Sequence, residues 1–138
     1  MKPRIILHVG SEKTGSTSIQ RALKDNIKLL AQQGYLVPQT LGYPCHINLT
    51  ACVLESEPTH PVRNLLGISD KKSFKIFREK TLKSFKKETS EGNFHTILIS
   101  DEHINVHLIR LDLMEKYKIF FDDIGDVSWK VPTVTMRF

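Results

Sequence analysis

Short apolar runs alternate with amphipathic stretches along this chain, and the alternation predicts its elements. Arg4–Val9 is a β-branched apolar run bounded by Gly10, which is typical of a buried parallel strand. Apolar residues then recur at helical spacing from Thr17 to Gln33, and Gly34 is a suitable stop. The apolar face of this helix is expected to cover the sheet, and it consists of Ile19, Leu23, Ile27 and Leu30.

The later part of the chain continues the same alternation. The pattern predicts a brief extended segment at Tyr35–Val37, helices at Ile47–Ser56, Ser73–Glu88 and Val106–Phe121, and strands at Phe94–Ser100 and Pro132–Arg137. Ser69 or Asp70 is a candidate cap for the helix at Ser73–Glu88, and an irregular exposed connection is expected from Pro58 to Gly67. Asp122–Asp126 reads as an acidic turn. Strands alternating with helices indicate an α/β fold, with a parallel sheet flanked by helices, in a single domain over residues 1–138.

Composition fits a soluble globular protein, because 40% of the residues are hydrophobic and 25% are charged. The net charge of +5 suits an anionic cofactor or acceptor. Lysines crowd the outer face of the helix at Ser73–Glu88, where a solvated surface is favoured over a polyanion site. Cys45 and Cys52 lack CxxC spacing and are interpreted as reduced small hydrophobes. With neither a signal-peptide run nor a bilayer-spanning stretch, the sequence predicts a cytoplasmic protein.

The stretch Ile5–Gln20 carries the strongest candidate chemistry, because a strand, a glycine-bounded loop and a helix start form an anion site. Gly10 and Gly15 let the backbone approach a phosphate, and Lys13 adds a full charge. The two glycines have Walker A spacing, but Ser16 stands where an NTPase needs lysine. The loop is therefore expected to hold a 5′-phosphate without the usual device for ATP hydrolysis. The competing interpretation is an ordinary strand-to-helix turn with capping hydroxyls.

Residues Leu7–Gln20, LHVGSEKTGSTSIQ, resemble the 5′-phosphosulfate loop of the P-loop-like sulfotransferases, which reads LHIGxxKTGTTSIQ. Those enzymes use 3′-phosphoadenosine 5′-phosphosulfate (PAPS). Here Ser16 replaces a common threonine, and Glu12 stands where proline is frequent. The resemblance, to bacterial-type members, implies a three-layer architecture like that of P-loop NTPases. It also implies transfer of a sulfuryl group from PAPS to an acceptor hydroxyl, such as that of a carbohydrate, with PAP as product and no metal.

The resemblance assigns roles to particular residues. Lys13 would contact the bridging oxygen of the leaving group. The 5′-phosphate would be cradled by Thr14, Gly15, Ser16, Thr17 and Ser18. Arg137, at the end of a predicted strand, would bind the 3′-phosphate of the cofactor. The family's serine that completes this second site has no counterpart, so the chain resembles the N-terminal portion of a sulfotransferase domain, truncated at its C-terminus.

Two residues compete for the role of general base. His46 follows a Tyr-Pro-containing loop, where family members often carry a catalytic His or Glu, and the pKa of histidine lies near working pH. Glu102 ends the segment Ser100-Asp101-Glu102, which resembles the family's Ser-Ser-Glu. The structural alternatives are a plain helix N-terminal histidine for His46 and a helix cap for Glu102.

Two other functions remain open at this point. The segment TILISDE at Thr96–Glu102 looks like a Walker B strand, in which Asp101 would hold Mg²⁺ in a kinase that uses ATP. A non-catalytic domain that binds PAP or a polyanion is the third interpretation. His103 and His107 have metal-ligand spacing, but they lack HExxH order and a clear third ligand, so no metal is expected. Nucleic acid is not expected as a partner.

Overall fold

The computed structural model describes residues 2–9, 16–42, 45–107, 110–122 and 124–130. Within these residues the chain forms an α/β fold, and its parallel sheet has the strand order β2-β3-β1-β4. The strands are β1 (Arg4–His8), β2 (Tyr35–Leu36), β3 (Thr96–Ser100) and β4 (Asp126–Lys130). The predicted α/β class and its parallel sheet are confirmed.

The two central strands, β1 and β3, are runs of branched apolar residues. Ile5 pairs with Ile97 and Leu7 pairs with Ile99, and all four side chains are buried. Paired residues of parallel strands point to the same face, so this face of the sheet is continuously apolar. Such a face must be covered by other elements.

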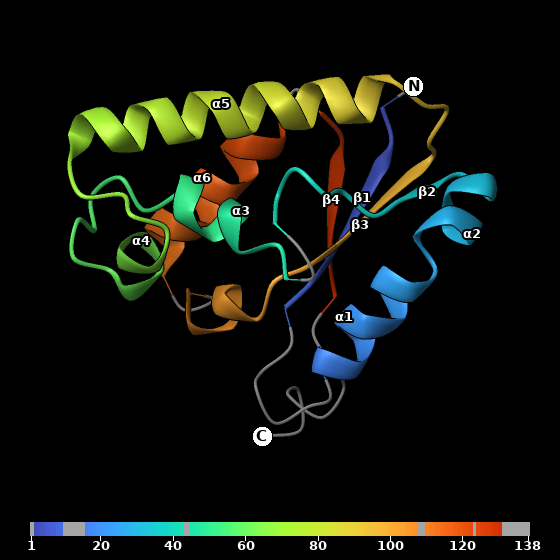
Figure 1. Ribbon diagram of the computed structural model, residues 1–138, viewed down its shortest axis with the longest axis horizontal. Helices are drawn as coiled ribbons and strands as arrows, with labels where there is room; N and C mark the ends of the chain where they lie inside the picture. The colour runs from blue at the N-terminus through green and yellow to red at the C-terminus, as the bar shows by residue number, and fades with distance from the viewer. Residues whose placement is uncertain (1, 10–15, 43–44, 108–109, 123, 131–138) are drawn as a thin grey trace.

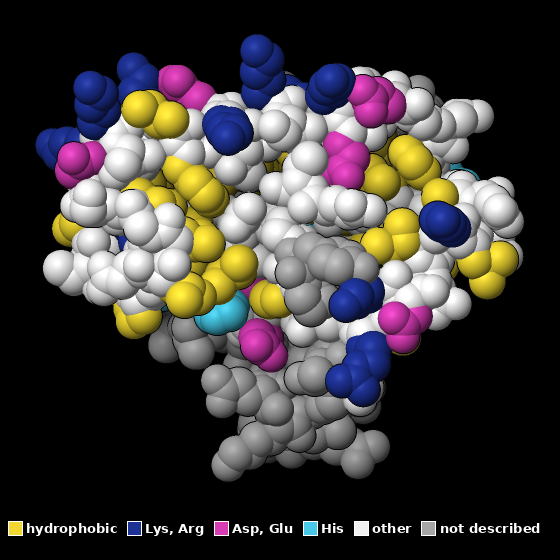
Figure 2. Space-filling view, viewed as in Figure 1, with side chains coloured by type: hydrophobic (Ala, Val, Ile, Leu, Met, Phe, Trp, Pro, Cys, Tyr) yellow, Lys and Arg dark blue, Asp and Glu magenta, His cyan; other side chains and the backbone are white. Residues whose placement is uncertain are grey.

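Helices lie on both sides of the strands. Figure 1 shows α1 and α2 on one side and α3, α4 and α6 on the other, with α5 along the top of the view. The helices are α1 (Ser16–Asp25), α2 (Ile27–Gln32), α3 (Ile47–Cys52), α4 (Pro61–Leu65), α5 (Lys71–Ser90), the 3-10 helix η1 (Glu102–His107) and α6 (Leu111–Phe121). A capping box between Asp70 and Ser73 starts α5, which confirms one of the two predicted caps. In Figure 2, dark-blue Lys and Arg side chains lie along the top of the view, where Figure 1 shows α5.

The hydrophobic core lies between the sheet and the group α3–α6. Phe85 of α5 stacks on Phe120 of α6 with ring centroids 6.1 Å apart, and it meets Phe121 edge-on at 6.3 Å. The other side of the sheet is thinly covered, because α2 has no buried residue and Ile19 of α1 is 39% exposed. The predicted apolar face of the first helix is thus only partly buried.

That first helix is also divided, contrary to the prediction of one helix from Thr17 to Gln33. It breaks at Asn26 into α1 and α2. The Asn26 side chain donates to the carbonyl of Ala22 at 2.7 Å, while its backbone N–H turns to Leu23. Asparagine competes in this way for backbone groups that a continuous helix needs.

The connection from Pro58 to Gly67 is more ordered than predicted, because it contains α4. Pro61 sits in the first turn, where a missing N–H costs nothing, and the His60 ring accepts a bond from the Val62 N–H at 3.1 Å. Arg63 is 1% exposed, so the expectation of an exposed segment fails at this residue.

Two further boundaries differ from the predictions. The helix predicted at Val106–Phe121 is divided into η1 and α6, and the helix predicted at Ile47–Ser56 ends at Cys52. A strand, β4, begins at Asp126, the last residue of the predicted acidic turn. It pairs with β1, and the alternation of polar and apolar residues in DVSWK was its signal. The strand predicted at Pro132–Arg137 lies outside the described residues.

Candidate active site

The carboxyl ends of β1 and β3 meet at one edge of the sheet, toward the bottom of Figure 1. His8 pairs with Ser100 there, and the His8 Nδ1 atom lies 2.9 Å from the Ser100 hydroxyl in a hydrogen bond. The Asp101 N–H donates to the His8 carbonyl at 3.1 Å. The segment after β1 and the polar cluster after β3 therefore leave the sheet side by side. In open α/β sheets, ligands bind at such edges.

The predicted cofactor loop is only partly described. Lys13, Thr14, Gly15 and Arg137 lie outside the described residues. Ser16 and Thr17 begin α1, and Ser18 in the same first turn is exposed. The backbone thus confirms the strand before the loop and the helix after it.

Asp101 is fully buried at this edge and organises the polar groups around it. Its carboxylate accepts hydrogen bonds from the Thr50 hydroxyl and, at 3.0 Å, from the His103 backbone N–H. The Tyr117 hydroxyl donates to Thr50 at 3.3 Å, and burial raises the pKa of Tyr117. This network ties α3 and α6 to the end of β3.

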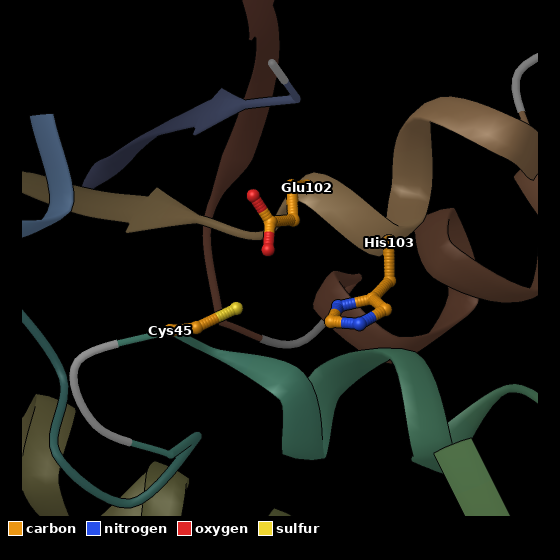
Figure 3. Close-up of side chains that lie close together, drawn as sticks. All are labelled: Cys45, Glu102 and His103. Atoms are coloured by element: carbon orange, nitrogen blue, oxygen red, sulfur yellow. The ribbon is translucent and has the colours of Figure 1, made fainter. Parts of the chain in front are cut away.

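Glu102 follows Asp101 and is half-buried at the start of η1. Figure 3 shows Glu102, Cys45 and His103 turned toward a common space between η1 and the chain before α3. One donor atom from each residue lies within 4.8 Å of the other two.

His46 occupies a different position, because its ring is 1% exposed and both ring nitrogens are engaged. Nδ1 accepts the Ser100 N–H at 2.9 Å, and Nε2 lies 2.8 Å from the Pro38 carbonyl. The pairing defines a neutral ring with its proton on Nε2. Burial lowers the pKa of His46. One of these bonds must break before His46 accepts a substrate proton.

Cys45 and His8 were not expected at the site. Both cysteines are free, as predicted, but the Cys45 thiol faces the Asp101 carboxylate at 3.9 Å. Burial and the charges of Asp101 and Glu102 raise the pKa of Cys45 to about 12. The buried Nε2 of His8 has no partner among the described residues, and burial lowers the pKa of this histidine. His8 belongs to the segment Leu7–Gln20 that carries the resemblance, but no role was predicted for it.

A cavity of about 430 Å³ lies away from this edge, between α3, α5 and α6. Its lining combines apolar and charged side chains, among them Phe74, Lys75, Arg78 and Ile119. It contains none of the predicted site residues. The chemistry at the ends of β1 and β3 is therefore separate from this pocket.

Comparisons of the chain with family models, with curated proteins and with solved structures found no match. Within the described part of the chain, none of the helices has the length and apolar character needed to cross a bilayer.

Proposed function

We propose that this chain forms part of a sulfotransferase that uses PAPS. One observation supports the proposal: β1, whose last two residues begin the LHVGSEKTGSTSIQ segment, lies beside β3, which leads into Glu102. The motif and the candidate base thus leave one edge of the sheet. A cofactor held after β1 would present its sulfuryl group to an acceptor near Glu102.

The proposed reaction is an in-line transfer. The acceptor hydroxyl attacks the sulfur of PAPS, and the bond from sulfur to the bridging phosphate oxygen breaks. The acceptor proton passes to a carboxylate, and the electron pair of the broken bond leaves with PAP. Lys13 stabilises the charge that develops on the bridging oxygen, and the residues from Thr14 to Ser18 hold the 5′-phosphate. Arg137 would bind the 3′-phosphate.

Glu102 is the better candidate for the base. It is half-buried and faces the space shared with Cys45 and His103, whereas His46 uses both ring nitrogens within the protein. We therefore assign proton transfer to Glu102 and give His46 a positioning role. The acceptor hydroxyl, such as that of a carbohydrate, would enter from the side of η1.

The strand order supports a finer description of the fold, a three-layer architecture like that of P-loop NTPases. The connection after β1 runs through α1 and α2, and the connection after β3 runs through η1 and α6 on the other side of the sheet. The two central strands thus send their connections to opposite faces. In sheets with such diverging connections, nucleotides bind at the carboxyl ends of the central strands.

The runner-up is a kinase or NTPase that uses Mg²⁺-ATP. Asp101 follows β3 directly, as a Walker B acid does. Its carboxylate, however, is buried and bonded to Thr50 and His103, and Ser16 replaces the nucleotide-binding lysine. A non-catalytic domain that binds a polyanion through the lysines of α5 is the third candidate.

A thermal-shift titration with PAP, ADP and ATP, each with and without Mg²⁺, separates these functions. At a concentration near 100 times the dissociation constant, PAP is expected to raise the melting temperature by roughly 5 to 15 °C without Mg²⁺. Lys13→Ala is expected to remove the shift, and Lys28→Ala on α2 is the matched control. Stabilisation by ATP only with Mg²⁺ would assign the kinase function instead. Binding that ignores the 3′-phosphate and falls steeply with salt would indicate a polyanion site.

A further inference from the structure

We propose that Cys45, Glu102 and His103 form a binding site for Zn²⁺. A thiol sulfur, a carboxylate oxygen and an imidazole nitrogen come within 4.8 Å of one another, and they come from two segments far apart in the sequence. Figure 3 shows the three side chains converging. Small side-chain movements bring such atoms to zinc-ligand distances of about 2.0 to 2.3 Å from a common centre.

The site is held in place by its surroundings. The His46 N–H donates to the Ser100 carbonyl at 3.1 Å, and the Ser100 N–H donates to the His46 ring at 2.9 Å. These two hydrogen bonds fix the chain next to Cys45 against the end of β3. Glu102 and His103 follow that strand end in the sequence. The donors are therefore brought together by the fold rather than by chance contact at the surface.

Asp101 adds the support that zinc ligands usually have. Its buried carboxylate lies 3.1 Å from the His103 Nδ1 atom and 3.9 Å from the Cys45 sulfur. A carboxylate behind a metal-binding histidine orients the ring and raises its basicity. Asp101 thus serves as an outer partner of the His103 ligand.

The donor set selects the kind of metal. Mg²⁺ and Ca²⁺ prefer oxygen ligands only, whereas sulfur, nitrogen and oxygen together suit Zn²⁺. Three protein ligands on a half-buried site leave a fourth position for water or an anion. The site therefore resembles an open zinc site more than a closed structural one.

The consequence for activity rests on the proposed sulfotransferase function. Zn²⁺ would occupy the Glu102 carboxylate to which we assign proton transfer, so it would inhibit transfer rather than support it. Metal binding itself does not depend on that function and is measured without PAPS. Failure of the function and failure of the metal site are therefore distinguishable.

Titration of the metal-free chain with Co²⁺, followed by displacement with Zn²⁺, tests the site. One ion per chain is expected, with a sulfur-to-cobalt charge-transfer absorption that Zn²⁺ abolishes. Cys45→Ser should remove this absorption, and Cys52→Ser, which changes the other free thiol, should retain it. His103→Gln and Glu102→Gln should each weaken Zn²⁺ binding by about 100-fold or more, beyond the roughly 10- to 100-fold cost of losing an outer partner.

The set of variants keeps the test valid even if one variant does not fold. If Cys45→Ser does not melt cooperatively, His103→Gln and Glu102→Gln carry the comparison, each checked by its metal-free melting curve. Absence of the sulfur-to-cobalt absorption in the unaltered chain would overturn the proposal. Zn²⁺ affinity that is unchanged in the folded His103→Gln and Glu102→Gln variants would overturn it as well.

Discussion

The imidazole of His46 joins two parts of the chain through both of its nitrogens. Replacing it with alanine removes the partners of the Ser100 N–H and the Pro38 carbonyl in a buried setting. A buried group left unpaired costs about 1 to 3 kcal/mol, so His46→Ala is expected to lower the free energy of unfolding by roughly 2 to 4 kcal/mol. Urea denaturation measures this loss. His95→Ala, at an exposed histidine, should cost about 1 kcal/mol or less, and equal losses would contradict the structural role.

The same histidine makes stability depend on pH. Burial lowers the pKa of His46 below its ordinary value of 6.5, against the opposing effects of the Pro38 carbonyl and of the Asp101 and Glu88 charges. Above pH 6.5 the ring is neutral in both states, so its contribution is intact. As the pH falls below 6.5, the unfolded chain binds the proton more readily and stability declines. Unfolding curves measured between pH 5 and 8 should show that the free energy of unfolding falls less steeply with decreasing pH in His46→Ala than in the unaltered protein. An identical pH dependence in the two proteins would refute this account.

Residue identity alone predicted the position of the polar segment after β3 better than it predicted the contacts of individual side chains. The segment Ser100–Glu102 was correctly placed at the end of a strand, because a β-branched run followed by acids marks such an end. His46 was predicted as a base from its position after a Tyr-Pro-containing loop and from its ordinary pKa. Its ring contacts Pro38 and Ser100 instead, and Ser100 is 54 positions away. The polar setting of Cys45 likewise arises from Asp101, which no local pattern connects to it.

At the scale of elements, Arg63 of α4 holds together the segments on either side of it. Its guanidinium donates to the carbonyls of Leu54 at 3.0 Å and Glu55 at 3.2 Å, and it lies 5.0 Å from the centre of the Phe74 ring. These contacts connect the chain after α3 with the first turns of α5. A buried arginine that satisfies several carbonyls explains why an apparently irregular segment adopts one conformation.

Arg63→Ala is therefore expected to lower the free energy of unfolding by roughly 2 to 4 kcal/mol, because buried carbonyls lose a charged donor. Arg63→Lys should restore only part of the loss, since an ammonium cannot reproduce the fork of the guanidinium. Arg21→Ala, on the exposed side of α1, is the control. Chemical denaturation compares the three variants, and full rescue by lysine would show that charge alone is sufficient.

Element boundaries were predictable where the local sequence signals agreed with one another. The helix α5 was found because its apolar spacing and the Asp70 cap agree. The first helix was predicted as continuous because periodicity runs across Asn26, whereas the hydrogen bond from this side chain to Ala22 divides it. The short β4 was missed because Asp126 was taken as the end of a turn, and its partner β1 lies more than a hundred residues earlier.

For the whole molecule, the two sides of the sheet differ in how well they are covered. The side of α3–α6 holds the aromatic core, whereas α2 buries no residue and Leu29 is 53% exposed. Helices with few buried contacts open more readily than those in the core. The candidate cofactor segment lies between β1 in the core and α1 on the weaker side, so nucleotide binding would act on the less stable part of the molecule.

Hydrogen exchange tests this coupling. Without ligand, amides of α1 and α2 are expected to exchange faster than those of β1, β3 and α5, because their helices have less buried surface. Since PAP would bind across the end of β1 and the start of α1, it should slow exchange mainly in these two elements. Lys13→Ala should remove that protection and leave the unliganded pattern unchanged, with Lys28→Ala as the control. Protection centred on α5 instead would indicate that the anion binds the lysine face of this helix. The protein would then present a polyanion surface rather than a cofactor loop.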